Sequence, residues 1–92
     1  MSGTPVTFRN WGDVRAFVLH RDQFICSYCL DDANQVDHLI PVVRLGPFFD
    51  PENLTAACRQ CNASKGGLTP QEWFDRDWGG RVPPWFQERH PA

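Results

Sequence analysis

The four cysteines of this chain form two Cys-x-x-Cys pairs, which constrain the fold more than any other feature. The first pair is Cys26 and Cys29, and the second is Cys58 and Cys61. A closed set of four cysteines is typical of a structural zinc site. The long segment between the pairs predicts a substantial element between two zinc knuckles. Disulfides, an iron–sulfur cluster and a redox role are the alternatives.

The length of 92 residues predicts one small domain over 1–92, with residues 1–8 flexible. Small domains bury little apolar surface, and a bound metal is a common source of stability for them. We find no apolar stretch long enough for a membrane helix and no signal-peptide pattern. We therefore expect a cytoplasmic protein. Its paired cysteines are then expected to bind metal, because disulfides are rare in a reducing compartment.

The formal net charge of −2 argues weakly against a nucleic-acid partner, and four zinc-bound thiolates would make the chain more negative. Net charge is nevertheless a poor guide to a local surface. Basic side chains that could gather on one face are Arg9, Arg15, Arg21, Arg44, Arg59, Lys65, Arg76 and Arg81. A divalent cation in an acidic site would also help a polyanion to approach.

The first half of the chain predicts a helix, a strand and a loop. Asn10 suits a helix N-cap, and apolar residues at helical spacing predict a helix over about 11–21. A β-branched run then predicts a strand that begins at residue 35. Because Pro41 interrupts this run, we expect the strand to end near Ile40. We expect a loop over 44–53.

The second half predicts a short strand and three helical segments. The strand covers 54–57, and a helix follows over 59–65 until two glycines end it. Thr69 begins the clearest capping box of the chain, and the helix after it should end at Gly79. A last helical turn is expected to start at Pro83.

Asp37 and His38 place a carboxylate beside an imidazole between the two cysteine pairs. Hydrolysis of a phosphodiester requires a water to be deprotonated, charge on phosphorus to be stabilised and the leaving oxygen to be neutralised. An imidazole can act as the base, and a carboxylate oxygen suits Mg²⁺ or Mn²⁺. Neighbouring residues of a strand point to opposite faces. Both residues can therefore serve one site only where the strand ends or twists.

Three further residues suit the same site. Asn53 is an amide that could hold the imidazole in one tautomer, Asn62 offers a second neutral oxygen ligand, and Lys65 follows one helical turn later. Each residue also has a structural interpretation. His38 could cap a turn, Asn53 could be a turn residue, Asn62 could begin a helix, and Lys65 could be solvated. A role for Asp37 or His38 as a zinc ligand is disfavoured because four cysteines already fill a tetrahedral shell.

The order of the motifs is more specific than any one of them. The chain carries Cys-x-x-Cys, Val-Asp-His-Leu-Ile-Pro, Asp-Pro-Glu-Asn-Leu and Cys-x-x-Cys-Asn-x-x-Lys in turn. Over about residues 21–66 this resembles the HNH endonuclease family of the ββα-metal superfold. The resemblance implies a small α+β fold stabilised by zinc, with a lead-in N-terminal helix and additional C-terminal helices. It also implies a metal-dependent DNA endonuclease.

The resemblance implies a role for each motif residue. His38 matches the general base, Asn53 matches the asparagine that orients it, and Asp37 and Asn62 match the ligands of one divalent cation, Mg²⁺ or Mn²⁺. Histidine is commoner at the position of Asn62, so the chain resembles the HNN variant. An amide oxygen there favours harder cations.

Lys65 and Arg59 are candidate contacts to substrate phosphate. Two departures from the family pattern leave the substrate-facing surface open. Leu30 stands where such knuckles often carry glycine, and residues 46–49 place bulky aromatics in the loop.

The expected partners are DNA and, as a further candidate, a larger DNA-processing enzyme, because small members of the family often act that way. We expect no membrane partner, and a monomer or weak dimer. The main alternative is a non-catalytic zinc module that binds nucleic acid or protein. Such a module has no need for the set formed by Asp37, His38, Asn53 and Asn62.

Overall fold

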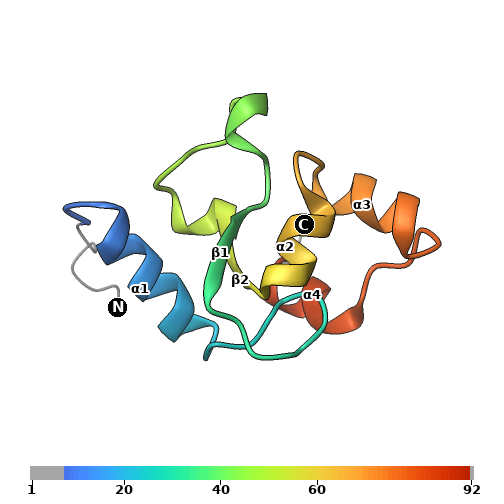
Figure 1. Ribbon diagram of the computed structural model, residues 1–92, viewed down its shortest axis with the longest axis horizontal. Helices are drawn as coiled ribbons and strands as arrows, with labels where there is room; N and C mark the ends of the chain where they lie inside the picture. Colours follow the sequence, from blue (N-terminus) through green and yellow to red (C-terminus); the bar gives the residue numbers. More distant parts are fainter. Residues whose placement is uncertain (1–7, 92) are drawn as a thin grey trace.

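The structure is a computed structural model that describes residues 8–91. A two-stranded antiparallel sheet lies between the N-terminal helix on one side and three shorter helices on the other (Figure 1). The fold is thus the small α+β arrangement expected from the sequence. The elements in chain order are α1 (Trp11–Arg21), β1 (Gln35–His38), η1 (Val42–Arg44), η2 (Pro51–Asn53), β2 (Leu54–Ala57), α2 (Arg59–Lys65), α3 (Pro70–Asp77) and α4 (Pro84–Arg89).

Local capping explains where the helices begin. The Asn10 side chain accepts a hydrogen bond from the Asp13 amide at the start of α1. Thr69 and Glu72 form a complete capping box at the start of α3. These bonds satisfy amide groups that lack a partner within a helix. The expected bounds of α1, α2 and β2 are confirmed, because the signals that set them are local.

The first strand ends at His38, two residues earlier than expected. Beyond it, the Leu39 amide donates to the Asn53 carbonyl, and the Ile40 amide donates to Oδ1 of Asn53. The chain leaves the strand pairing here because both amides are bound by a single residue that precedes β2. The loop that follows contains two 3₁₀ turns, η1 and η2.

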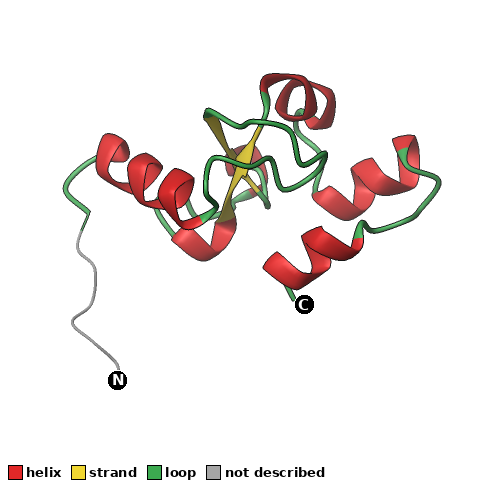
Figure 2. Cartoon of the chain, turned by 90° about the horizontal axis from the view of Figure 1, so that it is seen from below, coloured by secondary structure: helices red, strands yellow, loops and turns green. Residues whose placement is uncertain are grey.

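The two strands pair in a register that runs from Gln35 opposite Ala57 to His38 opposite Leu54. Side chains alternate between faces along a strand. Asp37 is thus on the face that meets α2, and His38 is on the face that meets α1; both helices contact β1. The view from below shows the same arrangement, with the strands between α1 and the C-terminal helices (Figure 2).

The apolar core has two parts, and β2 contributes residues to both. The smaller part is formed by α1 and β2 and contains Val14, Val18 and Leu54. The larger part joins the first cysteine pair, β2 and the C-terminal helices. Its buried members are Leu19, Cys26, Tyr28, Ala33, Ala56, Ala57, Trp73, Phe74 and Phe86. Within residues 8–91, no helix has the length and apolar character needed to cross a membrane.

Candidate functional site

The structure brings the four cysteines together. Their sulfur atoms all lie within 4.8 Å of one another, and Sγ of Cys29 is 3.7 Å from Sγ of Cys58. Four sulfurs bound at about 2.3 Å to a tetrahedral zinc are separated by about 3.8 Å. The cluster is therefore able to hold a metal ion, and its geometry is compatible with zinc.

Backbone contacts place the two knuckles. Cys58 is the N-cap of α2, where its sulfur accepts from the Cys61 amide. In the first knuckle the Tyr28 amide lies 3.4 Å from the sulfur of Cys26. Burial and the neighbouring sulfurs raise the pKa of Cys29 to about 11 and raise that of Cys61 as well. A cation among the sulfurs would remove this penalty on the thiolates.

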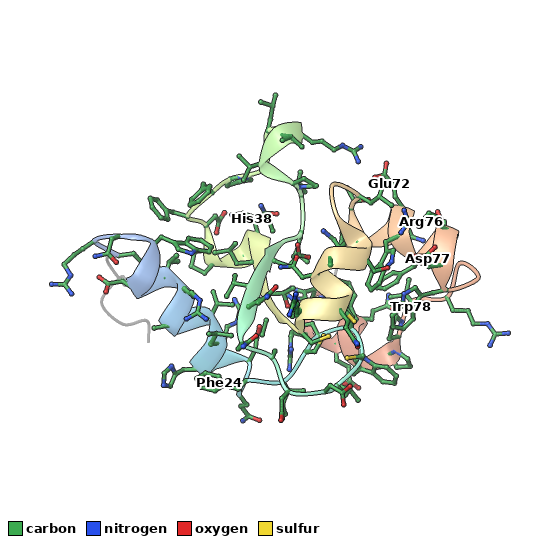
Figure 3. All side chains as sticks on the ribbon, viewed as in Figure 1. Phe24, His38, Glu72, Arg76, Asp77 and Trp78 are labelled. Atoms are coloured by element: carbon green, nitrogen blue, oxygen red, sulfur yellow. The ribbon has the colours of Figure 1, made fainter. Side chains whose placement is uncertain are left out.

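His38 lies at the end of β1, beside the loop that follows it (Figure 3). Its Nε2 is 3.1 Å from the carbonyl oxygen of Phe48. A carbonyl can only accept, so Nε2 carries the proton and Nδ1 of the neutral ring keeps its lone pair. The ring also stacks on Trp11 of α1, and Phe48 packs against both. The structure thus leaves one defined nitrogen of His38 available as a base.

Asn53 holds the loop that presents the Phe48 carbonyl. Its Oδ1 accepts from the Ile40 amide, and its Nδ2 donates to the carbonyls of Ile40 and Pro47. Gly46 packs against the same place, because a Cβ there would lie 1.9 Å from the Ile40 carbonyl oxygen. The Asn53 amide hydrogen bonds are therefore to the loop rather than to the imidazole, and the contact that fixes the imidazole comes from Phe48.

The Asp37 side chain is buried, with 6% of the residue exposed. Two donor groups contact one of its carboxylate oxygens. Its Oδ2 accepts from the Tyr28 hydroxyl at 2.6 Å and lies 3.0 Å from Nζ of Lys65. Burial raises the pKa of Asp37, while Lys65 and Tyr28 act in the opposite direction. Burial also raises the pKa of Tyr28, which keeps its hydroxyl a donor. Oδ1 has a longer contact of 3.3 Å with the Lys65 ammonium.

Asp37, His38 and Asn62 line one open pocket of about 380 Å³ beside the turn that follows β1. Nδ2 of Asn62 donates a hydrogen bond to Oε1 of Gln35, and the two atoms are 2.9 Å apart. This bond leaves Oδ1 as the atom of the Asn62 amide that can act as a ligand. The two predicted ligands and the predicted base thus border a common space although they come from β1 and α2.

The two candidate phosphate contacts lie apart. Lys65 is the last residue of α2 and is 1% exposed, and its Nζ is bound by Asp37 and by the His38 carbonyl. Arg59 is exposed at the opposite end of α2, where it lines a separate pocket with Asp31 and Asp32. The structure therefore places the Lys65 ammonium inside the frame, and Arg59 at a distance from the His38 pocket.

Three residues of the site have no sequence pattern that predicts their role. Trp11 could be recognised only as part of the apolar stripe of α1, and Tyr28 only as a residue inside a knuckle. The role of Phe48 depends on its carbonyl oxygen, which every residue has, so no side-chain pattern reveals it.

The comparisons agree with this geometry. The family model of the HNH endonuclease matches residues 26–67. Among solved structures, the type II-C Cas9 enzyme from Actinomyces naeslundii is 30% identical with a TM-score of 0.57, over 76% of this chain. The match covers only 8% of that enzyme, and no curated protein matches. The matched motifs, the shared fold and the four-cysteine cluster together show that residues 26–67 match the HNH endonuclease family.

Proposed function

We propose that the chain is a metal-dependent endonuclease that hydrolyses phosphodiester bonds in DNA with His38 as the general base. The observation that carries the proposal is the imidazole, which is held at Nε2 by Phe48 and borders a pocket with Asp37 and Asn62. The family match and the likeness to Cas9 support a nuclease-type function and a nucleic-acid substrate.

The residues of the chain prepare the base for this reaction. The Phe48 carbonyl accepts a hydrogen bond from the Nε2–H group, and the stacked indole of Trp11 restricts the ring. Nδ1 then takes a proton from a water that attacks phosphorus in line. As the family resemblance implies, the products carry 5′-phosphate and 3′-hydroxyl ends.

Asp37 and Asn62 fit a hard divalent cation, because each offers an oxygen at the same pocket. When bound, Mg²⁺ or Mn²⁺ supplies positive charge to the phosphorus oxygens and to the departing oxygen. Removal of the carboxylate in Asp37→Ala is expected to raise the Mg²⁺ concentration needed for half-maximal cleavage.

We also propose that the cysteines hold a structural zinc. Zinc binding by such sites contributes about 10–16 kcal/mol in apparent free energy, which is enough to decide whether a small domain folds. Cys58→Ser is expected to lose both bound zinc and the fold. Metal analysis and circular dichroism measure these two properties. A well-folded Cys58→Ser protein without metal would contradict the zinc proposal.

Cleavage of supercoiled plasmid tests the proposed activity. We expect relaxed or linear DNA with Mg²⁺ or Mn²⁺, and none with EDTA or with His38→Ala. His20→Ala is the matched control, because His20 lies exposed on α1, where its ring bonds to the Ala16 carbonyl. Full cleavage by His38→Ala would refute the base assignment.

A non-catalytic binding module is the second candidate. The internal pairing of Asp37 with Lys65 favours it, because a carboxylate neutralised in this way needs no cation. Plasmid that is bound but left uncut by the wild-type protein under every metal condition would support the module. Participation of a larger DNA-processing enzyme stays a prediction, and a module would be consistent with it.

A further inference from the structure

The Tyr28 side chain joins the first cysteine pair to the predicted cation ligand. Tyr28 lies between Cys26 and Cys29 in sequence and is fully buried. Its hydroxyl donates to Oδ2 of Asp37 at 2.6 Å, the distance of a strong hydrogen bond to a carboxylate. A residue of the metal-binding knuckle thus makes the shortest contact to the Asp37 side chain.

The phenol ring is held from several directions. It packs edge-on against Trp73 with the ring centroids 5.1 Å apart, and it stacks on Phe86 at 5.4 Å. The backbone is fixed as well, because the Tyr28 carbonyl accepts from Nε1 of Trp85 at 3.0 Å. The hydroxyl therefore has a defined position that does not depend on Asp37.

The contacts of the two donors are distributed unequally between the two carboxylate oxygens of Asp37. Oδ2 receives the Tyr28 hydroxyl and the Lys65 ammonium, at 2.6 and 3.0 Å. Oδ1 has only the 3.3 Å contact with Lys65, and an ionised carboxylate oxygen can accept more than one partner. Without the phenol, the carboxylate could rotate and share both oxygens with the ammonium. The Tyr28 bond opposes that rotation.

We propose that Tyr28 is a positioning residue of the cation site, which fixes Oδ2 of Asp37 so that Oδ1 is left to bind the divalent cation. This inference rests on the proposed function. It makes the first knuckle part of the reaction site, because the metal that orders Cys26 and Cys29 also orders the phenol between them.

Tyr28→Phe tests the inference, since it keeps the ring and removes only the hydroxyl. Mn²⁺ affinity is measured by electron paramagnetic resonance of free Mn²⁺, and cleavage is titrated with Mg²⁺. We expect the Mn²⁺ dissociation constant to rise about 3- to 10-fold, the factor that corresponds to the net contribution of a typical hydrogen bond. Zinc content should be unchanged. Half-maximal cleavage should shift to higher Mg²⁺ by a similar factor.

Trp73→Phe is the matched control. It removes the indole hydrogen bonds to Ser64 and Asp77 from the same aromatic cluster but leaves the Asp37 contacts in place. We expect its Mn²⁺ affinity to stay within about twofold of wild type, since a twofold change corresponds to less than a typical hydrogen bond. An unchanged Mn²⁺ affinity in Tyr28→Phe would overturn the inference, and so would an equal loss in both variants.

Lys65→Met keeps the inference testable where Tyr28→Phe fails to fold. With Oδ2 still held by Tyr28, removal of the ammonium beside Oδ1 should leave Mn²⁺ binding as tight as in wild type or tighter. Weaker binding would overturn the inference. Failure of the proposed function gives a different result. Full cleavage by His38→Ala would refute the assignment of His38 as the base, but it would leave the differences in Mn²⁺ affinity between the other variants and wild type unchanged.

Discussion

The indole of Trp11 lies nearly parallel to the imidazole of His38, with the ring centroids 5.5 Å apart and 14° between the planes. The Phe48 ring is 5.0 Å from each of them, and the Phe48 carbonyl bonds to Nε2 of His38. Two separate segments of the chain, α1 and the loop after β1, therefore hold the proposed base. The N-terminal helix has a part in the site as well as in the core.

Trp11→Leu should lower the rate of cleavage while the protein stays folded. Aromatic pairs of this kind contribute about 0.5–1.5 kcal/mol beyond their buried area. If the stacking holds the imidazole in its reactive orientation, its loss corresponds to a decrease of about 2- to 10-fold in kcat. Single-turnover cleavage at saturating Mg²⁺ measures this effect without a contribution from product release.

Two variants separate orientation from stability. Trp11→Phe should keep most of the rate because it keeps an aromatic face. Trp78→Leu removes an indole from the C-terminal aromatic cluster, where Trp78 packs against Trp73 and Phe74, and it should lower stability without changing kcat. Equal effects of Trp11→Leu and Trp78→Leu on kcat would show that stacking on His38 has no special part.

Gly46→Ala should disrupt the loop that presents the Phe48 carbonyl. A Cβ at this position would lie 1.9 Å from the Ile40 carbonyl oxygen and 3.0 Å from Nδ2 of Asn53. The backbone must move, so the free energy of unfolding should fall by about 2 kcal/mol or more. Cleavage should decline further than stability alone explains, because the partner of Nε2 is displaced. Chemical denaturation and plasmid cleavage measure the two effects.

Gly67→Ala is the control for this substitution. Gly67 lies on the rim of the pocket that contains Asp37 and His38, and a Cβ there would meet no atom within 4 Å. Its stability should change by less than about 0.5 kcal/mol, as for an ordinary surface position. If both alanine variants behave alike, close packing at Gly46 is not what holds the loop.

Signals that act over a few residues were sufficient to predict most of the elements. The Asn10 cap, the Thr69 capping box and the strand over 54–57 all appear where the sequence predicts them. The four-cysteine cluster was predictable for a related reason, because its spacing limits the chain to few arrangements. The end of β1 was missed because it depends on Asn53, which lies fifteen residues beyond His38 in sequence and bonds back to Ile40.

The sequence did not predict the side-chain contacts made by Asp37. Lys65 carries a charge that usually lies in solvent, yet the structure buries it against Asp37. That placement depends on how α2 packs on β1, which no local pattern specifies. The Tyr28 hydroxyl reaches the same carboxylate for the same reason. Sequence reasoning thus identified the candidate residues, whereas their partners follow from packing.

Leu30→Gly should stabilise the protein. Leu30 closes the first knuckle with φ of +69°, in the left-handed region, and its side chain is 48% exposed. A residue with a Cβ pays about 1–2 kcal/mol in this conformation, while glycine costs about 0.5–1 kcal/mol in chain entropy. The expected net gain is about 0.5–1 kcal/mol, measured by thermal or chemical unfolding with zinc present.

Val43→Gly provides the comparison for Leu30→Gly. Val43 is 85% exposed and lies within η1, where φ is not positive. Glycine there brings only its entropic cost, so the protein should become less stable or stay unchanged. A loss of stability in Leu30→Gly as large as that in Val43→Gly would show that the left-handed backbone is not a source of strain.

His90 should make the stability depend on pH below neutrality. Burial and the positive charges of Arg21 and Arg89 lower the pKa of His90 to about 4, while Asp22 acts in the opposite direction. The ring is packed on α4, where its Nε2 lies 2.7 Å from the Thr55 hydroxyl oxygen. The neutral form is therefore preferred in the folded state, whereas the unfolded chain takes up a proton near pH 6.5.

The direction of the effect follows from proton uptake. Between about pH 6.5 and pH 4 the unfolded state binds more protons at His90 than the folded state does, so the free energy of unfolding falls as the pH falls. Because the ring is partly exposed, we expect a loss of about 1–2 kcal/mol across this range. His90→Gln removes the titrating group, and denaturant unfolding at several pH values compares it with wild type.

Acid release of zinc lowers the stability of both proteins, so the quantity of interest is the difference between them. Parallel pH profiles would mean that His90 is equally easy to protonate in the folded and unfolded states.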